Sequence, residues 1–290
     1  MPKNRNIVIH LLYTAFQLLK KHPVALFPLA ITAFLELIAL EIIYFLPRWP
    51  LNILFAPIVR TLWGEQFLHY PANFILMYRL IYYAQVLIYI GIGGFLIAVT
   101  CSLVYDTNSD KTPHLKTAFR KNSKKYIDIF CIALIITVCL LTLRKGYDFT
   151  LKSIISSQIY AANHIVIALK KWLIHSSNYV NFILGILTDT AFAYCIPLII
   201  IKNKKILAAL KDNFKALKNN FIATFLFVLV PSLSALPLIY LNNNASALMD
   251  KICPEIVPLM IILGVILSLF INGYVISLIT LYYLQKCQKE

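Results

Sequence analysis

The sequence predicts an all-α, polytopic membrane helix bundle with six transmembrane helices. Of its 290 residues, 60% are hydrophobic and only 13% are charged, whereas about a quarter of the residues in soluble proteins are charged. The apolar residues form blocks close to the ~20 residues that an α-helix needs to cross a ~30 Å hydrocarbon core. Basic residues gather beside these blocks. We therefore expect one integral membrane domain over 1–290, without a sizeable water-soluble part.

Six apolar blocks predict the spans, at residues 24–46, 80–105, 127–143, 181–201, 221–241 and 258–284. The first is longer than the 7–15 apolar residues of a cleavable signal peptide, so we expect it to remain as a transmembrane helix. The third is the shortest, because Arg144 and Lys145 cut it off. We expect it to cross by snorkelling of these side chains or by local thinning of the bilayer.

The distribution of basic residues predicts the orientation of the six helices. If the N-terminus lies inside, the inner connections carry twice as many Lys and Arg residues as the outer connections. Cytoplasmic loops of membrane proteins carry such an excess. The sequence therefore predicts a multi-pass protein of the bacterial inner membrane with both termini in the cytoplasm. The same excess explains the net charge of +15, so we expect no nucleic acid partner, for which the chain has no binding motif.

A basic, amphipathic helix is predicted directly before the fifth span. Between residues 204 and 221, apolar side chains recur at intervals of three and four, which places them on one face of a helix. They are Leu207, Leu210, Phe214, Leu217 and Phe221, and four lysines form a second row beside them. A helix with one apolar and one cationic face lies well in the plane of a membrane surface. Each lysine near an anionic leaflet contributes roughly 1 kcal/mol to that binding.

Similar basic helices are predicted before the first and third spans, and both contain the sequence TAF, at Thr14 and Thr117. We therefore expect a lipid bilayer with an anionic inner leaflet as a partner. The candidate lipid contacts are Lys20, Lys21, Lys116, Arg120, Lys124, Lys125, Lys204, Lys211, Lys215 and Lys218. The spacing also indicates three repeats of a two-span unit, over 1–105, 106–201 and 202–290. Alternatively, any pair of spans with basic inner loops gives this pattern, and both interpretations remain open.

Two outer connections are also predicted to contain amphipathic helices, at 49–69 and 150–175. The first has Trp49 and Trp63 beside several apolar residues, and the second has Trp172 beside two lysines. Tryptophan and lysine in such positions are typical of a membrane interface. We expect both helices to lie on or above the outer surface, and a re-entrant pair that lines a path through the membrane is the alternative.

Three acidic residues, Glu36, Glu41 and Asp189, lie within predicted spans. A charged side chain at membrane depth costs at least ~2.5–3.5 kcal/mol on insertion scales, so it usually faces the bundle interior or water. One interpretation is that Glu36 and Asp189 belong to a path for protons or cations. The other is that each acid is neutral, or is hydrogen-bonded by polar side chains of neighbouring helices.

The sequence contains no pattern that predicts catalysis or a metal site. Its six histidines and six cysteines are scattered, without the spacing of HExxH or CxxC, and no GxSxG or glycine-rich nucleotide motif occurs. We therefore expect no cofactor, no metal ion and no enzymatic activity.

Residues Phe192–Phe225, FAYCIPLIIIKNKKILAALKDNFKALKNNFIATF, resemble a broad group of six-span bacterial integral membrane proteins of unknown function. That group includes the membrane domain attached to some glycerophosphodiester phosphodiesterases. The likeness consists of an aromatic residue and a proline at a span end, a short polar link and an amphipathic helix. The residues that fit are Tyr194, Pro197, Ala209, Phe214, Leu217, Lys218 and Asn220. The resemblance implies a fold type. It implies no catalytic residue, because the 290 residues do not include the phosphodiesterase domain.

Together, these observations predict a non-enzymatic membrane component with a membrane-organising, lipid-contacting or assembly role. Such a role is compatible with a membrane-protein partner or with a homo-oligomer. The alternative function is that of a small permease or transporter subunit that uses the intramembrane residues Glu36 and Asp189.

Overall fold

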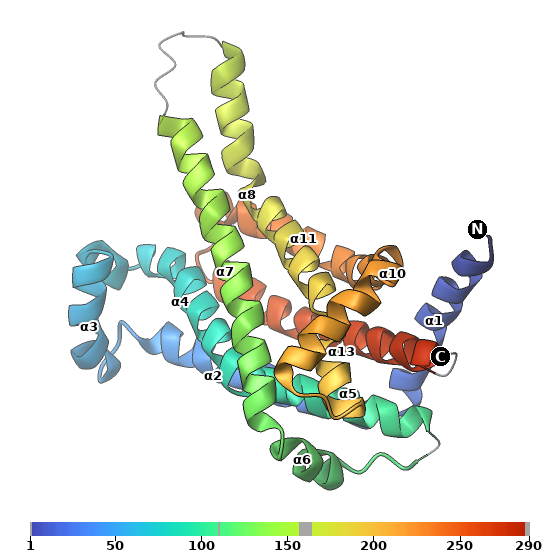
Figure 1. Ribbon diagram of the computed structural model, residues 1–290. Coiled ribbons are helices and arrows are strands. Elements are labelled where there is room, and N and C mark those ends of the chain that lie inside the picture. The colour runs from blue at the N-terminus through green and yellow to red at the C-terminus, as the bar shows by residue number, and fades with distance from the viewer. Residues whose placement is uncertain (1, 110, 157–163, 288–290) are drawn as a thin grey trace.

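The computed structural model describes residues 2–109, 111–156 and 164–287, which form helices and short connections without a strand (Figure 1). The α-helices are α1 (Pro2–Lys21), α2 (Phe27–Phe45), α3 (Leu51–Leu62), α4 (Ala72–Ile88), α5 (Gly94–Asn108), α6 (Leu115–Ser123), α7 (Tyr126–Ser156), α8 (His164–Ala191), α9 (Cys195–Ile201), α10 (Ile206–Ser232), α11 (Leu236–Asn243), α12 (Ala245–Lys251) and α13 (Ile256–Cys287). Shorter helical turns are η1 (Pro23–Leu26), η2 (Glu65–Leu68), η3 (Tyr89–Gly93) and η4 (Leu233–Ala235).

Within the described residues, six helical segments are long and apolar enough to cross a membrane. They are Pro23–Phe45, Ala72–Asn108, Tyr126–Ile154, Ser176–Ile201, Ile206–Asn243 and Ile256–Lys286. Each predicted span coincides with one of these segments to within one residue or lies inside it. The prediction is therefore confirmed: the chain is an all-α, six-span membrane helix bundle.

The three basic helices predicted before the first, third and fifth spans all form. They are α1, α6 and the first half of α10. α1 and α6 are separated from their spans by short turns, whereas α10 continues into its span through a kink at Asn220, where φ is −131°. The basic helix and the fifth span are thus one bent helix. Whether the three two-span units are structural repeats stays a prediction.

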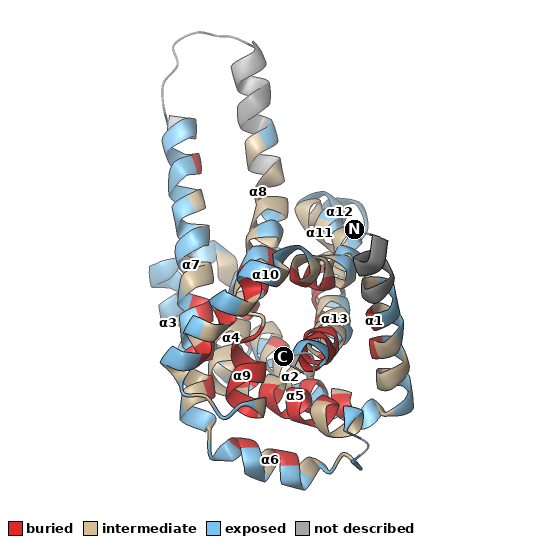
Figure 2. Ribbon diagram, turned by 45° about the vertical axis from the view of Figure 1, so that its right-hand side comes forward, coloured by how far each residue is buried: buried red, intermediate tan, exposed pale blue. Residues whose placement is uncertain are grey.

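Several contacts gather the basic segments at one end of the bundle. Lys125, just after α6, donates a hydrogen bond to the carbonyl oxygen of Ile199 in α9, at 2.6 Å. Lys202 follows α9, and its ammonium lies 5.7 Å from the centre of the Tyr283 ring in α13. We call α6, residues 202–205, the first half of α10 and the C-terminal part of α13 the basic end. In Figure 2, α6 lies at the bottom and the tips of α7 and α8 lie at the top.

The third span does not end at Arg144, because α7 continues for 12 residues beyond it, to Ser156. Arg and Lys are good helix formers, so the two charges end the apolar stretch without ending the helix. α7 and α8 pack side by side as a long hairpin (Figure 1). The surface helix predicted over 150–175 is not a separate element in the described residues. Its two ends belong to α7 and α8, and residues 157–163 lie outside the described part.

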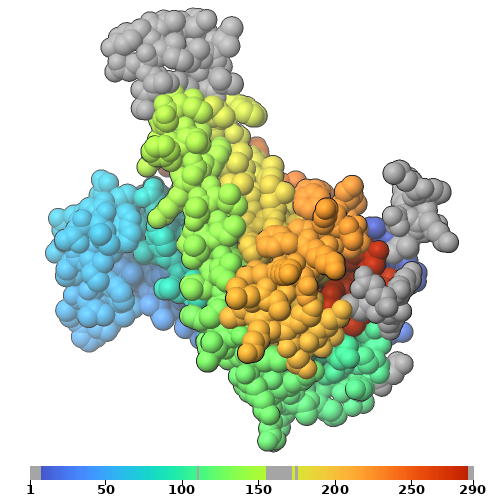
Figure 3. Space-filling model, viewed as in Figure 1, coloured from blue at the N-terminus to red at the C-terminus, as the bar shows by residue number. Residues whose placement is uncertain are grey.

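The helix predicted over 49–69 is present as α3, followed by η2, and it projects from the bundle at the left of Figure 3. Pro57 lies inside α3 and does not end it. The apolar side chains of Leu54, Ile58 and Leu62 are exposed, so an apolar face of α3 points away from the rest of the protein. This arrangement agrees with a helix at a membrane surface, and the location itself stays a prediction.

The core lies where α5, α9, α10 and α13 meet near the basic end (Figure 2). Close approach of α5 and α7 requires Gly94, because a Cβ at this position would lie 2.8 Å from the Cβ of Ala133. Asn122 of α6 is buried and donates hydrogen bonds to Ser102 Oγ at 2.9 Å and to the Ala98 carbonyl oxygen at 3.3 Å. α6 is therefore fixed to α5 by polar contacts as well as by apolar packing.

Candidate functional site

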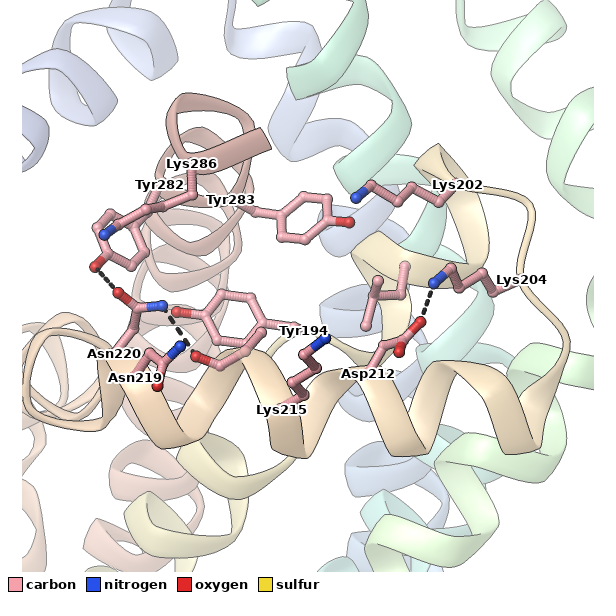
Figure 4. A pocket seen from close by; sticks show the side chains of 12 residues that line it. Tyr194, Lys202, Lys204, Asp212, Lys215, Asn219, Asn220, Tyr282, Tyr283 and Lys286 are labelled. Atoms are coloured by element: carbon pink, nitrogen blue, oxygen red, sulfur yellow. Dashed lines mark hydrogen bonds and ion pairs between the residues drawn. The ribbon is translucent and has the colours of Figure 1, made fainter. Parts of the chain in front are cut away.

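A polar pocket of about 320 Å³ lies at the basic end, between residues 194–204, α10 and α13 (Figure 4). It is lined by Tyr194, Leu198, Lys202, Lys204, Asp212, Lys215, Ala216, Asn219, Asn220, Tyr282, Tyr283 and Lys286. Four of these residues are lysines and one is an aspartate. The pocket therefore carries a net positive charge of three at neutral pH, where lysine and aspartate are both ionised.

One wall of the pocket includes the turn between α8 and α9, and Asn213 of α10 fixes this turn. α8 ends at Ala191, and a turn over residues 192–194 leads into α9. The side chain of Asn213 is fully buried. Its Oδ1 accepts the backbone N–H of Tyr194 at 2.9 Å, and its Nδ2 donates to the Ala191 carbonyl oxygen at 2.7 Å. These bonds satisfy backbone groups that the turn leaves unpaired, and they fix α10 against the turn.

The kink of α10 supplies the opposite wall. Tyr282 of α13 donates a hydrogen bond from its hydroxyl to Asn220 Oδ1 at 2.8 Å. Tyr194 and Thr224 are hydrogen-bonded through their hydroxyl groups. The kink therefore lies between two tyrosine contacts, one from α13 and one from the turn before α9. These two contacts hold α10, α13 and the turn before α9 in a fixed arrangement around the pocket.

The lysines of the pocket differ in their partners. Lys204 forms an ion pair with Asp212, which also lines the pocket. Lys202 and Lys286 lie 5.7 and 5.8 Å from the centres of the Tyr283 and Tyr282 rings. Lys215 points into the pocket in Figure 4. Only one lysine is thus neutralised by a carboxylate of the lining, which leaves ammonium groups available to an anionic group of matching size.

The predicted lipid contacts have different surroundings. Lys204 and Lys215 belong to the pocket. Eight of the ten basic side chains are exposed: Lys20, Lys21, Lys116, Arg120, Lys124, Lys211, Lys215 and Lys218. Lys125 is half-buried, and its ammonium is held by the Ile199 carbonyl oxygen and by Asn203. Burial, together with the charge of Lys121, lowers the pKa of Lys125, and Asp128 opposes the shift. Lys125 therefore has a structural role at the end of α9.

The apolar row predicted on the basic half of α10 is divided between two environments. Leu217 is buried and Leu210 is partly buried against the core. Leu207, Phe214 and Phe221 are exposed, with 81%, 50% and 44% of their surface accessible. The bundle instead binds a face made by Ala209, Asn213 and Leu217, because small and amide side chains allow close approach there. The remaining apolar side chains are exposed beside the lysines, although the Phe214 ring also contacts Phe192, with 6.0 Å between the ring centres.

The three intramembrane acids are not brought together. Glu36 of α2 accepts a hydrogen bond from Gln85 Nε2 of α4 at 2.8 Å, whereas Glu41 is exposed on α2. Asp189 lies on α8, where the charge of Arg144 acts on it without a direct ion pair. Arg144 therefore lies within a membrane-length helix. Its electrostatic effect on Asp189 could not be predicted from the sequence, which places Arg144 at the end of an apolar block.

Sequence reasoning missed several residues of the pocket, above all Lys202, Tyr282 and Lys286, and it missed the buried Asn213 that holds the turn at Tyr194. Lys202 and Lys286 lie next to span ends, which is a weak signal for a site. Asn213 lies between Ala209 and Leu217 on the buried face of the basic half of α10, and a polar residue in this pattern marks a buried polar anchor. Comparison with known proteins found no matching family model, no similar curated protein and no similar solved structure.

Proposed function

We propose that this protein is a non-enzymatic, lipid-contacting component of the bacterial inner membrane, with both termini in the cytoplasm, and that its basic end binds the phosphate group of an anionic phospholipid. The observation that carries the proposal is the pocket between residues 194–204, α10 and α13, with four lysines against one aspartate. Ammonium groups bind phosphate as compact positive charges. Anionic lipids are the abundant phosphate source at the cytoplasmic surface.

The exposed face of α10 supports a lipid as the ligand. Leu207 and Phe214 lie on the same helix half as Lys215, which faces the pocket. A helix with this pattern places its apolar side chains at the boundary between headgroups and acyl chains. The pocket would then lie at headgroup level, where a lipid presents its phosphate. A water-soluble phosphate compound would gain nothing from this apolar face.

The proposal is tested with the triple variant Lys202→Gln, Lys215→Gln, Lys286→Gln, which keeps the Lys204–Asp212 ion pair intact. The full chain is purified in a non-ionic detergent, and its binding of phosphatidylglycerol and phosphatidylcholine is measured by native mass spectrometry. We expect the wild type to prefer phosphatidylglycerol. At roughly 1 kcal/mol for each of the three lysines, the variant should bind it on the order of 100-fold more weakly.

The matched control is the triple variant Lys145→Gln, Lys152→Gln, Lys251→Gln. It loses the same charge at exposed positions away from the pocket, so we expect its phosphatidylglycerol binding to stay within about twofold of the wild type, because isolated surface charges contribute little. Equal losses in the two triple variants would show that binding follows total charge, and the pocket would no longer be the site.

A second candidate function is that of a small permease or transporter subunit. It is favoured by the surroundings of Asp189, which has an accessible side chain although it lies on a membrane-length helix. Glu36 and its partner Gln85 would supply a second polar position. If substrate movement depends on these acids, Glu36→Gln and Asp189→Asn should abolish flux in proteoliposomes at normal expression. Unchanged flux in both variants removes this candidate.

A further inference from the structure

The pocket at the basic end holds its lysines apart from one another. The ammonium of Lys286 lies 5.8 Å from the centre of the Tyr282 ring, whereas that of Lys202 lies 5.7 Å from the centre of the Tyr283 ring. Figure 4 shows Lys286 at one side of the pocket, apart from the other lysines, with Tyr283 between it and Lys202 in this view. The cations of the pocket are therefore spread along it.

The two tyrosines explain why Lys202 and Lys286 are separate. Tyr282 and Tyr283 are consecutive residues of α13, and consecutive side chains point about 100° apart around a helix. Both rings are buried, and the Tyr282 hydroxyl is held by Asn220 at 2.8 Å. An ammonium group is attracted to the face of an aromatic ring, so the two rings favour two different places for the two ammonium groups.

Three ammonium groups of the pocket are left without a carboxylate. Lys204 is neutralised by Asp212. Among the described residues, no carboxylate lies within ion-pair distance of Lys202, Lys215 or Lys286. Lys215 points into the pocket from α10 (Figure 4). A ligand therefore meets one cation at Lys286, one at Lys202 and a third at Lys215.

A single phosphodiester group matches this arrangement poorly. It carries one negative charge, and it accepts direct hydrogen bonds only from donors within about 3 Å of its oxygens. It would pair with the cation at one side of the pocket and leave the cation at the other side without a counter-charge. Two phosphate groups on a short linker would reach both sides.

The apolar surface beside the pocket favours a ligand with acyl chains. Lys215 and Asn219 line the pocket from α10. Leu207, Phe214 and Phe221 are exposed on the same half of this helix. Such a helix keeps its apolar side chains among the acyl chains of the leaflet, so a lipid bound in the pocket has apolar surface next to its phosphate groups.

We propose that the pocket binds a lipid with two phosphate groups, one at Lys286 and the other at Lys202, with Lys215 contributing its charge to both. This inference rests on the proposed function and goes further by naming the class of lipid. Cardiolipin, in which a glycerol joins two phosphatidyl groups, has this chemistry. Basic pockets between transmembrane helices on the cytoplasmic side bind such head groups. A water-soluble bisphosphate shares the two phosphates but lacks the acyl chains.

The test uses the full chain in a non-ionic detergent and measures lipid binding by native mass spectrometry. Cardiolipin and phosphatidylglycerol are compared at equal phosphate concentration. We expect the wild type to bind cardiolipin at least fivefold more tightly, the gain that one further lysine contact gives. Deacylated cardiolipin is added as a water-soluble competitor and should displace the intact lipid only weakly. Displacement at equal concentration would assign a soluble bisphosphate and overturn the lipid ligand.

Single lysine variants show whether both sides of the pocket are used. Lys286→Gln should lower the ratio of cardiolipin to phosphatidylglycerol affinity to within about twofold of one, whereas Lys286→Arg keeps the charge and should keep the preference. The matched control is Lys121→Gln. Lys121 is an exposed lysine of α6 whose ammonium lies 5.7 Å from the centre of the Tyr105 ring, outside the pocket lining. Equal ratios in Lys286→Gln and Lys121→Gln overturn the proposal.

Failure of this inference is distinguishable from failure of the proposed function. If the wild type binds the two lipids equally, a ligand with two phosphates is excluded. The phosphate site itself then stands as long as the variant Lys202→Gln, Lys215→Gln, Lys286→Gln binds phosphatidylglycerol more weakly than its control. If that variant binds like its control, the proposed function fails, and the two-phosphate ligand fails with it.

Discussion

Single polar residues in this bundle fix helix ends that apolar packing alone would leave free. Asn213 is the clearest case, because one side chain satisfies a backbone N–H at Tyr194 and a carbonyl at Ala191. Asn122 has a similar role between α6 and α5. In both cases the amide is buried on a helix that also carries exposed lysines, so the polar residue decides which helix face contacts the bundle.

Replacement of Asn213 by alanine should therefore destabilise the protein more than its volume suggests. The change leaves a buried N–H and a buried carbonyl unpaired, which costs about 2–4 kcal/mol in total. We expect the thermal midpoint in detergent to fall by roughly 5 °C or more. Asn219→Ala, at an exposed neighbouring position, is the matched control and should change the midpoint little. Equal midpoints for the two variants would show that Asn213 is not an anchor.

At the scale of the element, α10 has two apolar faces with different partners. One packs on the core through Ala209 and Leu217, and the other exposes Leu207, Phe214 and Phe221. The sequence shows the second face as part of a single continuous row, because spacing alone cannot tell which side a helix buries. The division of this row into a buried and an exposed part follows from Asn213, whose hydrogen bonds turn the face with Ala209 towards the bundle.

The exposed face of α10 should lie in lipid. A spin label at Leu207→Cys, in a variant without other cysteines, is expected about 5–10 Å below the headgroup boundary. Its collision rate with oxygen, which concentrates in the bilayer, should exceed that with a water-soluble nickel complex. A label at Lys111→Cys, in the exposed connection before α6, should show the reverse. A water-accessible label at position 207 would contradict a membrane-surface position for α10.

At the scale of the whole molecule, orientation is the property that most directly tests the function proposed above. In intact bacterial cells, single cysteines at Lys116 and Lys215 should resist a membrane-impermeant maleimide until the membrane is opened. Cysteines at Lys152 and Lys251 should react at once. This outcome follows from the excess of basic residues in the inner connections. Reaction of positions 116 and 215 from opposite sides would exclude a single basic surface.

The six crossings could be predicted because they depend on local composition, and each apolar block has the length that a bilayer requires. The basic helices could be predicted for the same reason. The turn at 192–194 could not, since no glycine or charge marks it and its backbone is satisfied by Asn213 from another helix. The pocket joins residues far apart in the chain, such as Lys204 with Tyr282. Such pairings arise only from tertiary packing.

The bend at Asn220 joins a surface helix to a membrane-crossing one within a single rod. Because Tyr282 of α13 donates a hydrogen bond to Asn220 at that bend, the angle between the two halves of α10 is tied to the position of α13. Asn220 and Tyr282 both line the pocket, so a change in the angle of the bend would also change the shape of the pocket.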